Sequence, residues 1–142
     1  MKTAKLVMSL SVACVMVMLV TGCATSPPAL TDEELIEVLT DEGMAAIEAQ
    51  DIDKLMTYFS EDFSNYQLGD KEGVQDFIEN AKQMGYLDDL EIDLTEKVTT
   101  ITGDKGSGGP VILNGSFGSI TITLDGVKEE GAWKVVNMDI QM

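Results

Sequence analysis

The chain has 142 residues and a formal net charge of −16, with 25 Asp and Glu against 9 Lys and with no Arg or His. Proteins hold nucleic acids by neutralising phosphates with Lys and Arg, and anionic membrane surfaces attract basic segments for the same reason, so the balance argues against both partners. Zinc sites and serine-type catalytic triads commonly use histidine, which is missing here. The acidity itself requires no ligand, because like charge keeps a protein soluble.

The N-terminal stretch has the parts of a secretory signal. Lys2 and Lys5 precede an apolar run from Leu6 to Val20, which is followed by small residues. Roughly 18 to 25 apolar residues are needed to cross a bilayer as a helix, and this run is shorter. We therefore expect residues 1–22 to be a cleaved signal peptide.

The end of that run, Val20-Thr21-Gly22-Cys23, resembles the lipobox of bacterial lipoproteins, in which the cysteine becomes lipidated. Cys14 would leave with the signal, and lipidation explains a single remaining Cys23 better than a free thiol in an oxidising compartment does. The alternative is an ordinary signal peptide with a chance cysteine. Each buried methylene contributes about 0.8 kcal/mol to membrane partitioning, so the three acyl chains implied by the resemblance would anchor the protein stably. Ala24, in place of Asp, favours the periplasmic face of the outer membrane in a cell with two membranes.

Removal of residues 1–22 would leave 120 of the 142 residues and, because Lys2 and Lys5 are lost with them, would move the formal charge from −16 to −18. That length suits one compact domain. Residues 23–30 include two prolines and show no helical or strand periodicity, which predicts a lipidated tether. Residues 31–142 are expected to form the domain.

The domain should begin with two helices. Thr31 and Glu34 have the spacing of a capping box, and the helix that starts there should run to about Ala49. Asp51 or Asp53 should cap a shorter helix, whose apolar residues fall at positions i, i+3, i+4 and i+7.

A third helix should follow Asp70, which is a good capping residue, and should stop at Gly85. Between the second and third helices, residues 63–68 are expected to form a short strand. The apolar stripes of all three helices are interpreted as core and not as cofactor sites.

From residue 87 onward the apolar period changes to two, which predicts strands. Residues 103–109 are expected to be a turn-rich break, Asn114-Gly115 should reverse the chain before Gly118, and residues 128–131 should form the last turn. Helices first and antiparallel strands afterwards predict an α+β fold, with three N-terminal helices packed on one face of a curved sheet of about four to five strands.

No cofactor or metal is expected. Asp89, Glu91 and Asp93 would share one face of an alternating strand, which is typical of a half-solvated strand, and no segment fits an EF-hand. The glycine-rich stretch at 103–109 lacks the Gly-Lys-Ser/Thr ending of a phosphate-binding loop.

In residues 45–63 a predicted helix ends in a bend rich in Asp and continues to a pair of aromatic residues and an Asp, and the chain closes with Gly131-Ala132-Trp133-Lys134-Val135-Val136. These two segments resemble the opening and the final strand of the nuclear transport factor 2-like family. The resemblance covers residues 31–142 and points to the SnoaL-like and ketosteroid isomerase-like branches. It implies a cone, in which helices wrap a strongly bent sheet around a cavity used for small apolar or amphipathic ligands.

The same resemblance leaves enzyme and binding roles open, because some members are isomerases, dehydratases or cyclases and others only bind or dimerise. Such catalysis needs a base aimed into an apolar cavity. The resemblance puts Gln67 at the isomerase carboxylate position, and an amide cannot serve as a base. Asp62 matches another acidic position of the family, so an enzyme using Asp62 with Tyr58 or Tyr66 is the alternative, although a turn or cap residue is the simpler interpretation of Asp62.

We therefore expect an envelope lipoprotein, not an enzyme, whose cone holds a small apolar or amphipathic ligand or a partner protein. A homodimer, an envelope protein partner and a purely structural role are the alternatives. Aromatic residues at a cavity supply contact area with a polar handle, so they are the candidate ligand-binding residues. These residues are Tyr58, Phe59, Phe63, Tyr66, Phe117 and Trp133, of which Trp133 is also a natural core plug for the last hairpin.

Overall fold

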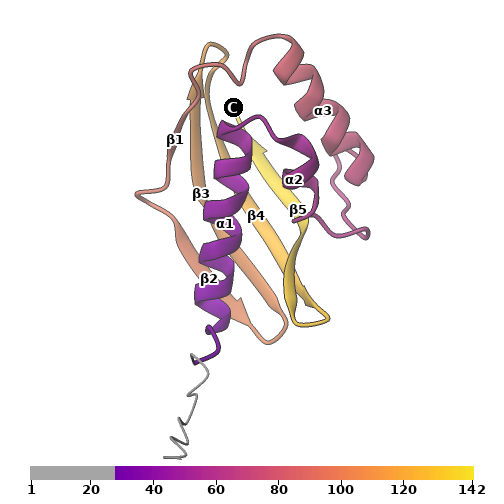
Figure 1. The fold of residues 1–142 in the computed structure, drawn as a ribbon, viewed down its shortest axis with the longest axis vertical. Helices are drawn as coiled ribbons and strands as arrows, with labels where there is room; N and C mark the ends of the chain where they lie inside the picture. Colours follow the sequence, from indigo (N-terminus) through magenta and orange to yellow (C-terminus); the bar gives the residue numbers. More distant parts are fainter. Residues whose placement is uncertain (1–27) are drawn as a thin grey trace, which may run out of the picture.

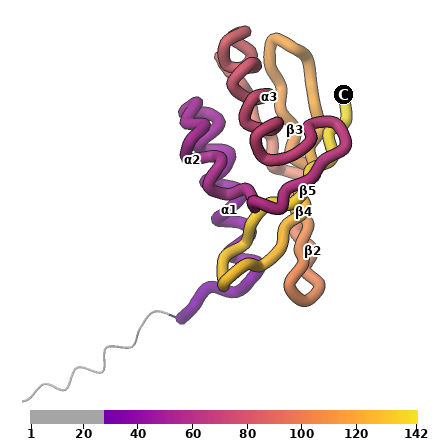
Figure 2. The backbone as a smooth tube through the Cα atoms, turned by 90° about the vertical axis from the view of Figure 1, so that its right-hand side faces the viewer, coloured from indigo at the N-terminus to yellow at the C-terminus, as the bar shows by residue number. Residues whose placement is uncertain are grey.

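The structure is a computed structural model that describes residues 28–142. The helices α1, α2 and α3 lie over one face of a single five-stranded antiparallel sheet (Figures 1 and 2). The elements are α1 (Asp32–Glu48), α2 (Ile52–Met56), α3 (Lys71–Gln83), β1 (Glu91–Asp93), β2 (Val98–Thr102), β3 (Lys105–Gly115), β4 (Gly118–Glu129) and β5 (Ala132–Gln141). The predicted α+β order, with three helices followed by the sheet, is confirmed.

The expected signal peptide, Cys23 and the tether up to residue 27 lie outside the described residues. Within residues 28–142, no helix has both the length and the apolar character needed to span a membrane.

Each helix begins at the residue that its capping residue predicts. Thr31 Oγ1 accepts from the Glu34 N–H at 3.3 Å, and the Glu34 carboxylate accepts from the Thr31 N–H at 2.7 Å, which completes the capping box. Asp51 and Asp70 cap α2 and α3, each accepting at 3.1 Å from the backbone N–H three residues later. Gly85 ends α3 with a φ of 74°, a conformation that glycine adopts without strain.

Two tight hairpins join β3, β4 and β5. Gly115 pairs with Gly118 at the end of the first hairpin, as predicted, and Glu130 and Gly131 form the second turn with φ values of 49° and 83°. The short strands β1 and β2 share one edge of β3, where β1 pairs near its C-terminal end and β2 near its N-terminal end.

The sheet is bent at two irregularities in its pairing. The register between β3 and β4 shifts between Gly108 and Val111, and the register between β4 and β5 shifts between Asp125 and Gly126. An extra residue of this kind bends a strand and increases its local twist. The bends let the sheet curve around the helices, so its inner face is concave.

The expected strand at residues 63–68 is wrong, because the segment is a loop built around Asn65. The buried Asn65 Oδ1 accepts from the N–H groups of Gln67 at 2.8 Å and Leu68 at 3.0 Å, and its Nδ2 donates to Asn137 Oδ1 on β5 at 3.1 Å. A side chain that satisfies nearby backbone groups in this way favours a turn over a sheet ladder.

The expected break at residues 103–109 is also wrong for most of its length. Only Gly103 and Asp104 form the turn between β2 and β3, and the later glycines belong to β3. A Cβ at Gly106 would lie 2.7 Å from Ile36 Cδ1 and 3.2 Å from Trp133 Cζ3. Glycine is therefore needed here because α1 and an indole approach the strand closely, a role that a turn pattern cannot distinguish.

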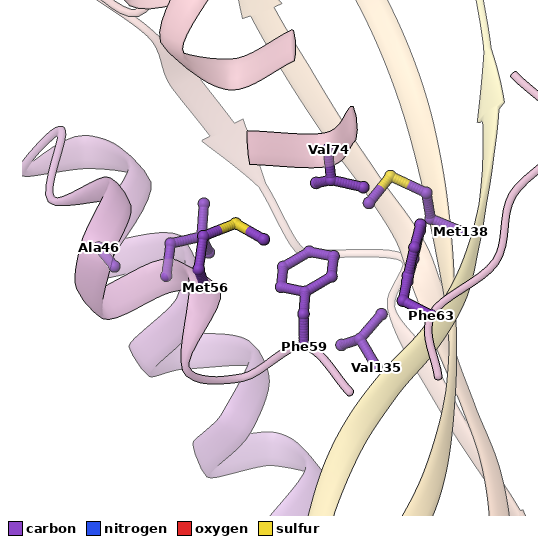
Figure 3. Close-up of a cluster of buried hydrophobic side chains, with 8 residues drawn as sticks. Ala46, Met56, Phe59, Phe63, Val74, Val135 and Met138 are labelled. Atoms are coloured by element: carbon purple, nitrogen blue, oxygen red, sulfur yellow. The ribbon is translucent and has the colours of Figure 1, made fainter. Parts of the chain in front are cut away.

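The core lies between the helices and the concave face of the sheet. Phe59 and Phe63 meet edge to face, with ring centroids 5.4 Å apart, and Val74, Val135 and Met138 surround them (Figure 3). This cluster fixes the loop after α2 and the start of α3 against β5.

Candidate ligand-binding cavity

A cavity of about 590 Å³ lies inside the cone, a volume typical of small-molecule sites. All three helices and the strands β3, β4 and β5 contribute to its wall, which is almost entirely apolar. No Asp, Glu or Lys side chain is among the described residues that line it. The core described above forms one side of this cavity and does not fill it.

Several lining residues are exposed at one end of the molecule, and we call this ring of residues the mouth. Met84 is 59% exposed and Met142 is 98% exposed, although both line the cavity. These residues belong to α3 and the segment after it, to the β3–β4 turn and to the C-terminus of the protein. The end of α3, that turn and the C-terminus lie at the same end of the fold (Figure 1). The mouth comprises Phe77, Met84, Tyr86, Phe117 and Met142.

The opposite end is filled, and we call it the closed end, made of Asp32, Ile36, Gly106, Lys128 and Trp133. Trp133 is only 4% exposed, and its Nε1 donates to Asp32 Oδ1 at 3.2 Å. Lys128 Nζ lies 2.6 Å from the same oxygen, and this hydrogen bond, with that of Trp133, holds the pKa of Asp32 below its usual range. The start of α1 is thereby fastened to the β4–β5 hairpin.

The deep part of the cavity offers few polar groups to a ligand. The Thr40 hydroxyl donates to the Ile36 carbonyl at 2.9 Å, within α1. The Tyr58 hydroxyl donates to Glu42 Oε2 at 2.8 Å, and this bond raises the pKa of Tyr58 and holds the hydroxyl away from a ligand. The remaining polar side chains of the wall, Gln67 and Asn80, are exposed. A ligand's polar group would therefore find partners only near solvent.

The predicted aromatic residues divide into two groups. Tyr58, Phe59 and Phe117 line the cavity, whereas Phe63, Tyr66 and Trp133 are not among the residues that line it. Phe63 is buried behind Phe59, and Tyr66 is 86% exposed in the loop that Asn65 organises. Trp133 is buried and fills the core at the closed end.

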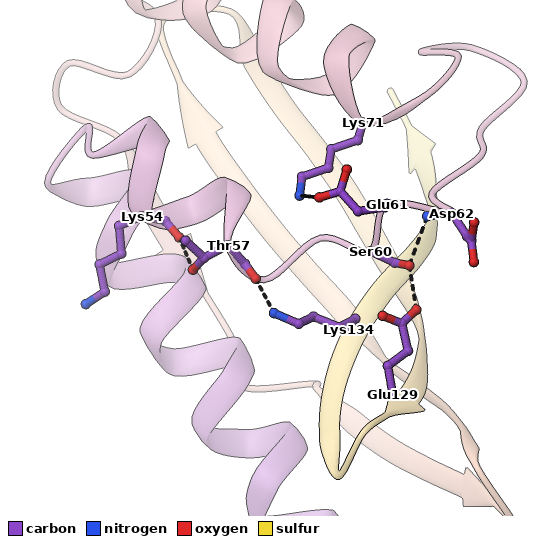
Figure 4. Close-up of polar contacts among 8 residues, drawn as sticks. All are labelled: Lys54, Thr57, Ser60, Glu61, Asp62, Lys71, Glu129 and Lys134. Atoms are coloured by element: carbon purple, nitrogen blue, oxygen red, sulfur yellow. Dashed lines mark hydrogen bonds and ion pairs between the residues drawn. The ribbon is translucent and has the colours of Figure 1, made fainter.

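Asp62, the base of the enzyme alternative, is exposed and does not line the cavity. Its backbone N–H donates to Ser60 Oγ at 3.0 Å, and Ser60 Oγ in turn donates to Glu129. The carboxylate of Asp62 is directed away from these partners (Figure 4). Within residues 28–142, the cavity wall therefore carries no carboxylate where that mechanism needs one, and Tyr66 also lies outside the wall.

Sequence reasoning misses four residues of the mouth, which are Phe77, Met84, Tyr86 and Met142. The apolar pattern of the third helix presents Phe77 and Met84 as ordinary core, and it does not single out Tyr86. The apolar stripe of α3 does not separate these residues from core, because a helix face that lines a cavity is as apolar as one that packs in a core. Residues 28–142 contain no group of three or more acidic side chains placed to hold a metal ion.

No protein family and no curated protein matches the sequence. Solved structures do match by shape. A nuclear transport factor 2-like protein of unknown function from Pseudomonas putida KT2440 has a TM-score of 0.66 at 15% identity, and the match covers 80% of this protein and 89% of that one. A provisionally assigned ketosteroid isomerase from Shewanella frigidimarina has a TM-score of 0.61 at 18% identity, covering 73% and 92%.

A third match is longer than this protein. Bd1075 from Bdellovibrio bacteriovorus has a TM-score of 0.64 at 16% identity, and the match covers 74% of this protein but only 38% of Bd1075. At these identities the likeness concerns the fold. Together with the helices packed on a bent five-stranded sheet, it shows that residues 28–142 adopt the nuclear transport factor 2-like cone fold.

Proposed function

We propose that this protein is a lipid-anchored binding protein of the cell envelope, without enzymatic activity, which holds a small uncharged apolar or amphipathic molecule in its cone. The observation that carries the proposal is the cavity of about 590 Å³ with an apolar wall. Burial of an unpaired charge in such a wall is very unfavourable, so an ionised group would have to stay at the mouth. An amphipathic ligand would therefore bind with its apolar part innermost.

Binding is proposed over catalysis because no Asp or Glu is among the described residues that line the cavity. Gln67 stands on the wall where the resemblance suggested an isomerase carboxylate, and Asp62 faces solvent. The Tyr58 hydroxyl is engaged by Glu42. None of these three side chains is placed to remove a proton from a molecule held inside the cone.

The anchoring part of the proposal comes from the lipobox-like Val20-Thr21-Gly22-Cys23. A lipid on Cys23 would connect to the closed end, because α1 begins there. Eight tether residues span at most about 29 Å, and the 17-residue α1 is about 25 Å long, so the mouth could reach the anchoring bilayer only with the tether fully extended. The ligand would then exchange with the surrounding solution or with another protein.

A fluorescence titration with the neutral probe N-phenyl-1-naphthylamine tests the binding function. Ala81 is a half-buried residue of α3 on the cavity wall, and Ala81→Phe places a ring in the open space. We expect at least tenfold weaker probe binding with no loss of folding. Ala45→Phe is the matched control, because Ala45 lies on the exposed side of α1 and does not line the cavity. Equal binding by the two variants, or no binding by the parent protein, would contradict the function.

The anchor is tested separately with Cys23→Ser in cells. We expect the parent protein in the membrane fraction, with incorporated palmitate, and the variant without the lipid label and released from the membrane. Label in neither protein would refute the anchor and leave the binding function untouched. Native mass spectrometry of the unlipidated domain distinguishes a bound small molecule from a second copy or a protein partner.

A further inference from the structure

We infer that Tyr86 and Phe117 form a specificity-determining pair at the mouth, positioned by Gly115, which sets the width of the molecules that can enter the cavity. The inference rests on the proposed binding function. Both rings line the cavity, and they meet edge to face with centroids 5.9 Å apart and an interplanar angle of 67°. They come from different parts of the chain, since Tyr86 follows α3 and Phe117 lies in the β3–β4 turn.

The position of Phe117 depends on Gly115. A Cβ at Gly115 would lie 2.7 Å from Phe117 Cε1 and 3.2 Å from Cδ1, a separation that real Cβ atoms do not tolerate. The Phe117 ring therefore lies over the bare backbone of a residue two positions earlier. Because Gly115 pairs with Gly118, only two residues form the turn, so the ring has a short and well-defined base.

Tyr86 is held by the end of α3. The Tyr86 N–H donates to the Ala81 carbonyl at 2.9 Å, and the Gly85 N–H donates to the Lys82 carbonyl at 3.0 Å. These two bonds, with the positive φ of Gly85, form a Schellman motif that ends the helix in a fixed geometry. Both rings thus stand on short, hydrogen-bonded turns and not on long loops.

The pair matters because both of its rings lie on the cavity wall and outside the packed core. The other aromatic pair of the described residues, Phe59 and Phe63, packs in the core. A molecule that enters must pass beside the Tyr86–Phe117 contact or separate it, and an edge-to-face pair is worth about as much as a three- to tenfold change in rate. A narrow molecule can pass beside the rings, whereas a wide one has to part them.

Stopped-flow release of two neutral probes tests the inference: 1-aminoanthracene, with three rings in line, and the wider 1-aminopyrene. We expect Phe117→Ala and Tyr86→Ala to accelerate release of the wide probe about three- to tenfold and to reduce the difference between the probes. Tyr86→Phe keeps the ring, so it should retain more of the difference between the probes than Tyr86→Ala does. Val98→Ala, an exposed apolar residue outside the cavity, is the control.

Gly115→Ala provides the sharper test, because it displaces the Phe117 ring without removing it. It should speed release of the wide probe in the parent protein and should add nothing in the Phe117→Ala background, since the displaced ring is then absent. Urea unfolding of each variant checks that the hairpin is retained.

Additive effects of Gly115→Ala and Phe117→Ala, or an unchanged rate ratio between the probes in Phe117→Ala, would overturn the inference. If Ala81→Phe weakens probe binding as expected but the ratio of the two release rates is unchanged in Phe117→Ala, the role of the Tyr86–Phe117 pair is refuted and the binding function stands. If the parent protein binds neither probe, the binding function is refuted as well.

Discussion

The closed end and the mouth are built from the same sheet and from similar side chains, yet one is filled and the other is hollow. At the closed end, Gly106 brings the backbone close to α1 and Trp133 fills the remaining space. At the mouth, the absence of a side chain at Gly115 also makes room for an aromatic ring, but that ring, Phe117, faces an open cavity. The comparison shows that a glycine beneath an aromatic residue can serve stability at one end and access at the other.

The filled closed end and the hollow mouth differ in how completely their aromatic side chains are buried and hydrogen-bonded. Trp133 has its indole N–H bound by Asp32 and its ring buried, so nearly its whole surface contributes to the folded state. Tyr86 and Phe117 cover each other only in part and leave a face toward the cavity. Mutations at the closed end should therefore change stability, whereas mutations at the mouth should change ligand exchange.

Trp133→Ala should have the largest effect on stability. Removal of a buried aromatic side chain costs about 3–5 kcal/mol, and here it also leaves Asp32 with one donor fewer. Urea denaturation measures the loss. Tyr66→Ala is the control, because the highly exposed Tyr66 should change stability by less than about 0.5 kcal/mol. A loss below about 1 kcal/mol in Trp133→Ala would show that the closed end does not hold the fold together.

Gly106→Ala should come next, with a loss of about 1–3 kcal/mol. Its new methyl group would lie 2.7 Å from Ile36 Cδ1 in a filled region, and overpacking forces neighbours out of their preferred positions. The unfolding midpoint in urea should fall while the slope stays the same. An unchanged midpoint would mean that Ile36 and Trp133 can move aside freely, which contradicts the description of this end as filled.

Gly43→Ala adds the same methyl group on the cavity side and should have the opposite sign. The nearest atom to its Cβ would be Leu55 Cδ1 at 3.9 Å, an ordinary contact, and Gly43 lies inside α1. Replacing an interior helical glycine by alanine stabilises by about 0.5–1 kcal/mol. Thermal unfolding of the two glycine variants side by side gives the comparison directly. Destabilisation by Gly43→Ala would show that the cavity wall is as tightly packed as the closed end.

The pH dependence of the closed end should give the smallest signal. The hydrogen bonds from Lys128 and Trp133 lower the pKa of Asp32, so its contribution to stability is present above the ordinary aspartate pKa of about 4 and is lost as the pH falls through the folded-state value. The stability difference between the parent and Asp32→Asn should therefore be steady at neutral pH and should close below pH about 4. Asp93, whose pKa is lowered by the Thr95 hydroxyl and N–H, titrates equally in both proteins and cancels. A difference that persists in acid would contradict this role for Asp32.

Much of the fold was predictable from local chemistry. Thr31 with Glu34, Asp51 and Asp70 mark helix starts because each satisfies backbone N–H groups within its own turn. The change of apolar period near residue 87 marks the transition from helices to strands. It is also a local signal, because alternate residues of each strand lie on the one face that is buried. The lipobox-like segment is also a local pattern, and its role as an anchor stays a prediction.

The errors share one cause, which is dependence on distant partners. Asn65 forms a turn and not a strand because Asn137 Oδ1 and the Met138 carbonyl, both on β5, accept hydrogen bonds from its side-chain amide. Gly106 belongs to a strand and not a turn because Ile36 and Trp133 pack against it. Neither contact is visible in a pattern of neighbouring residues.

The sequence by itself determined where the helices begin, that the chain reverses before Gly118 and near Gly131, and that the domain is acidic and lacks histidine and arginine. Only the tertiary structure decided which aromatic residues face a hollow and which face a filled core. Tyr66 follows Asn65 and Tyr86 follows Gly85, both of them turn-forming residues, but Tyr66 lies in solvent and Tyr86 lies at the mouth. A cavity is a volume that side chains from many elements leave unfilled, so no single segment can encode it.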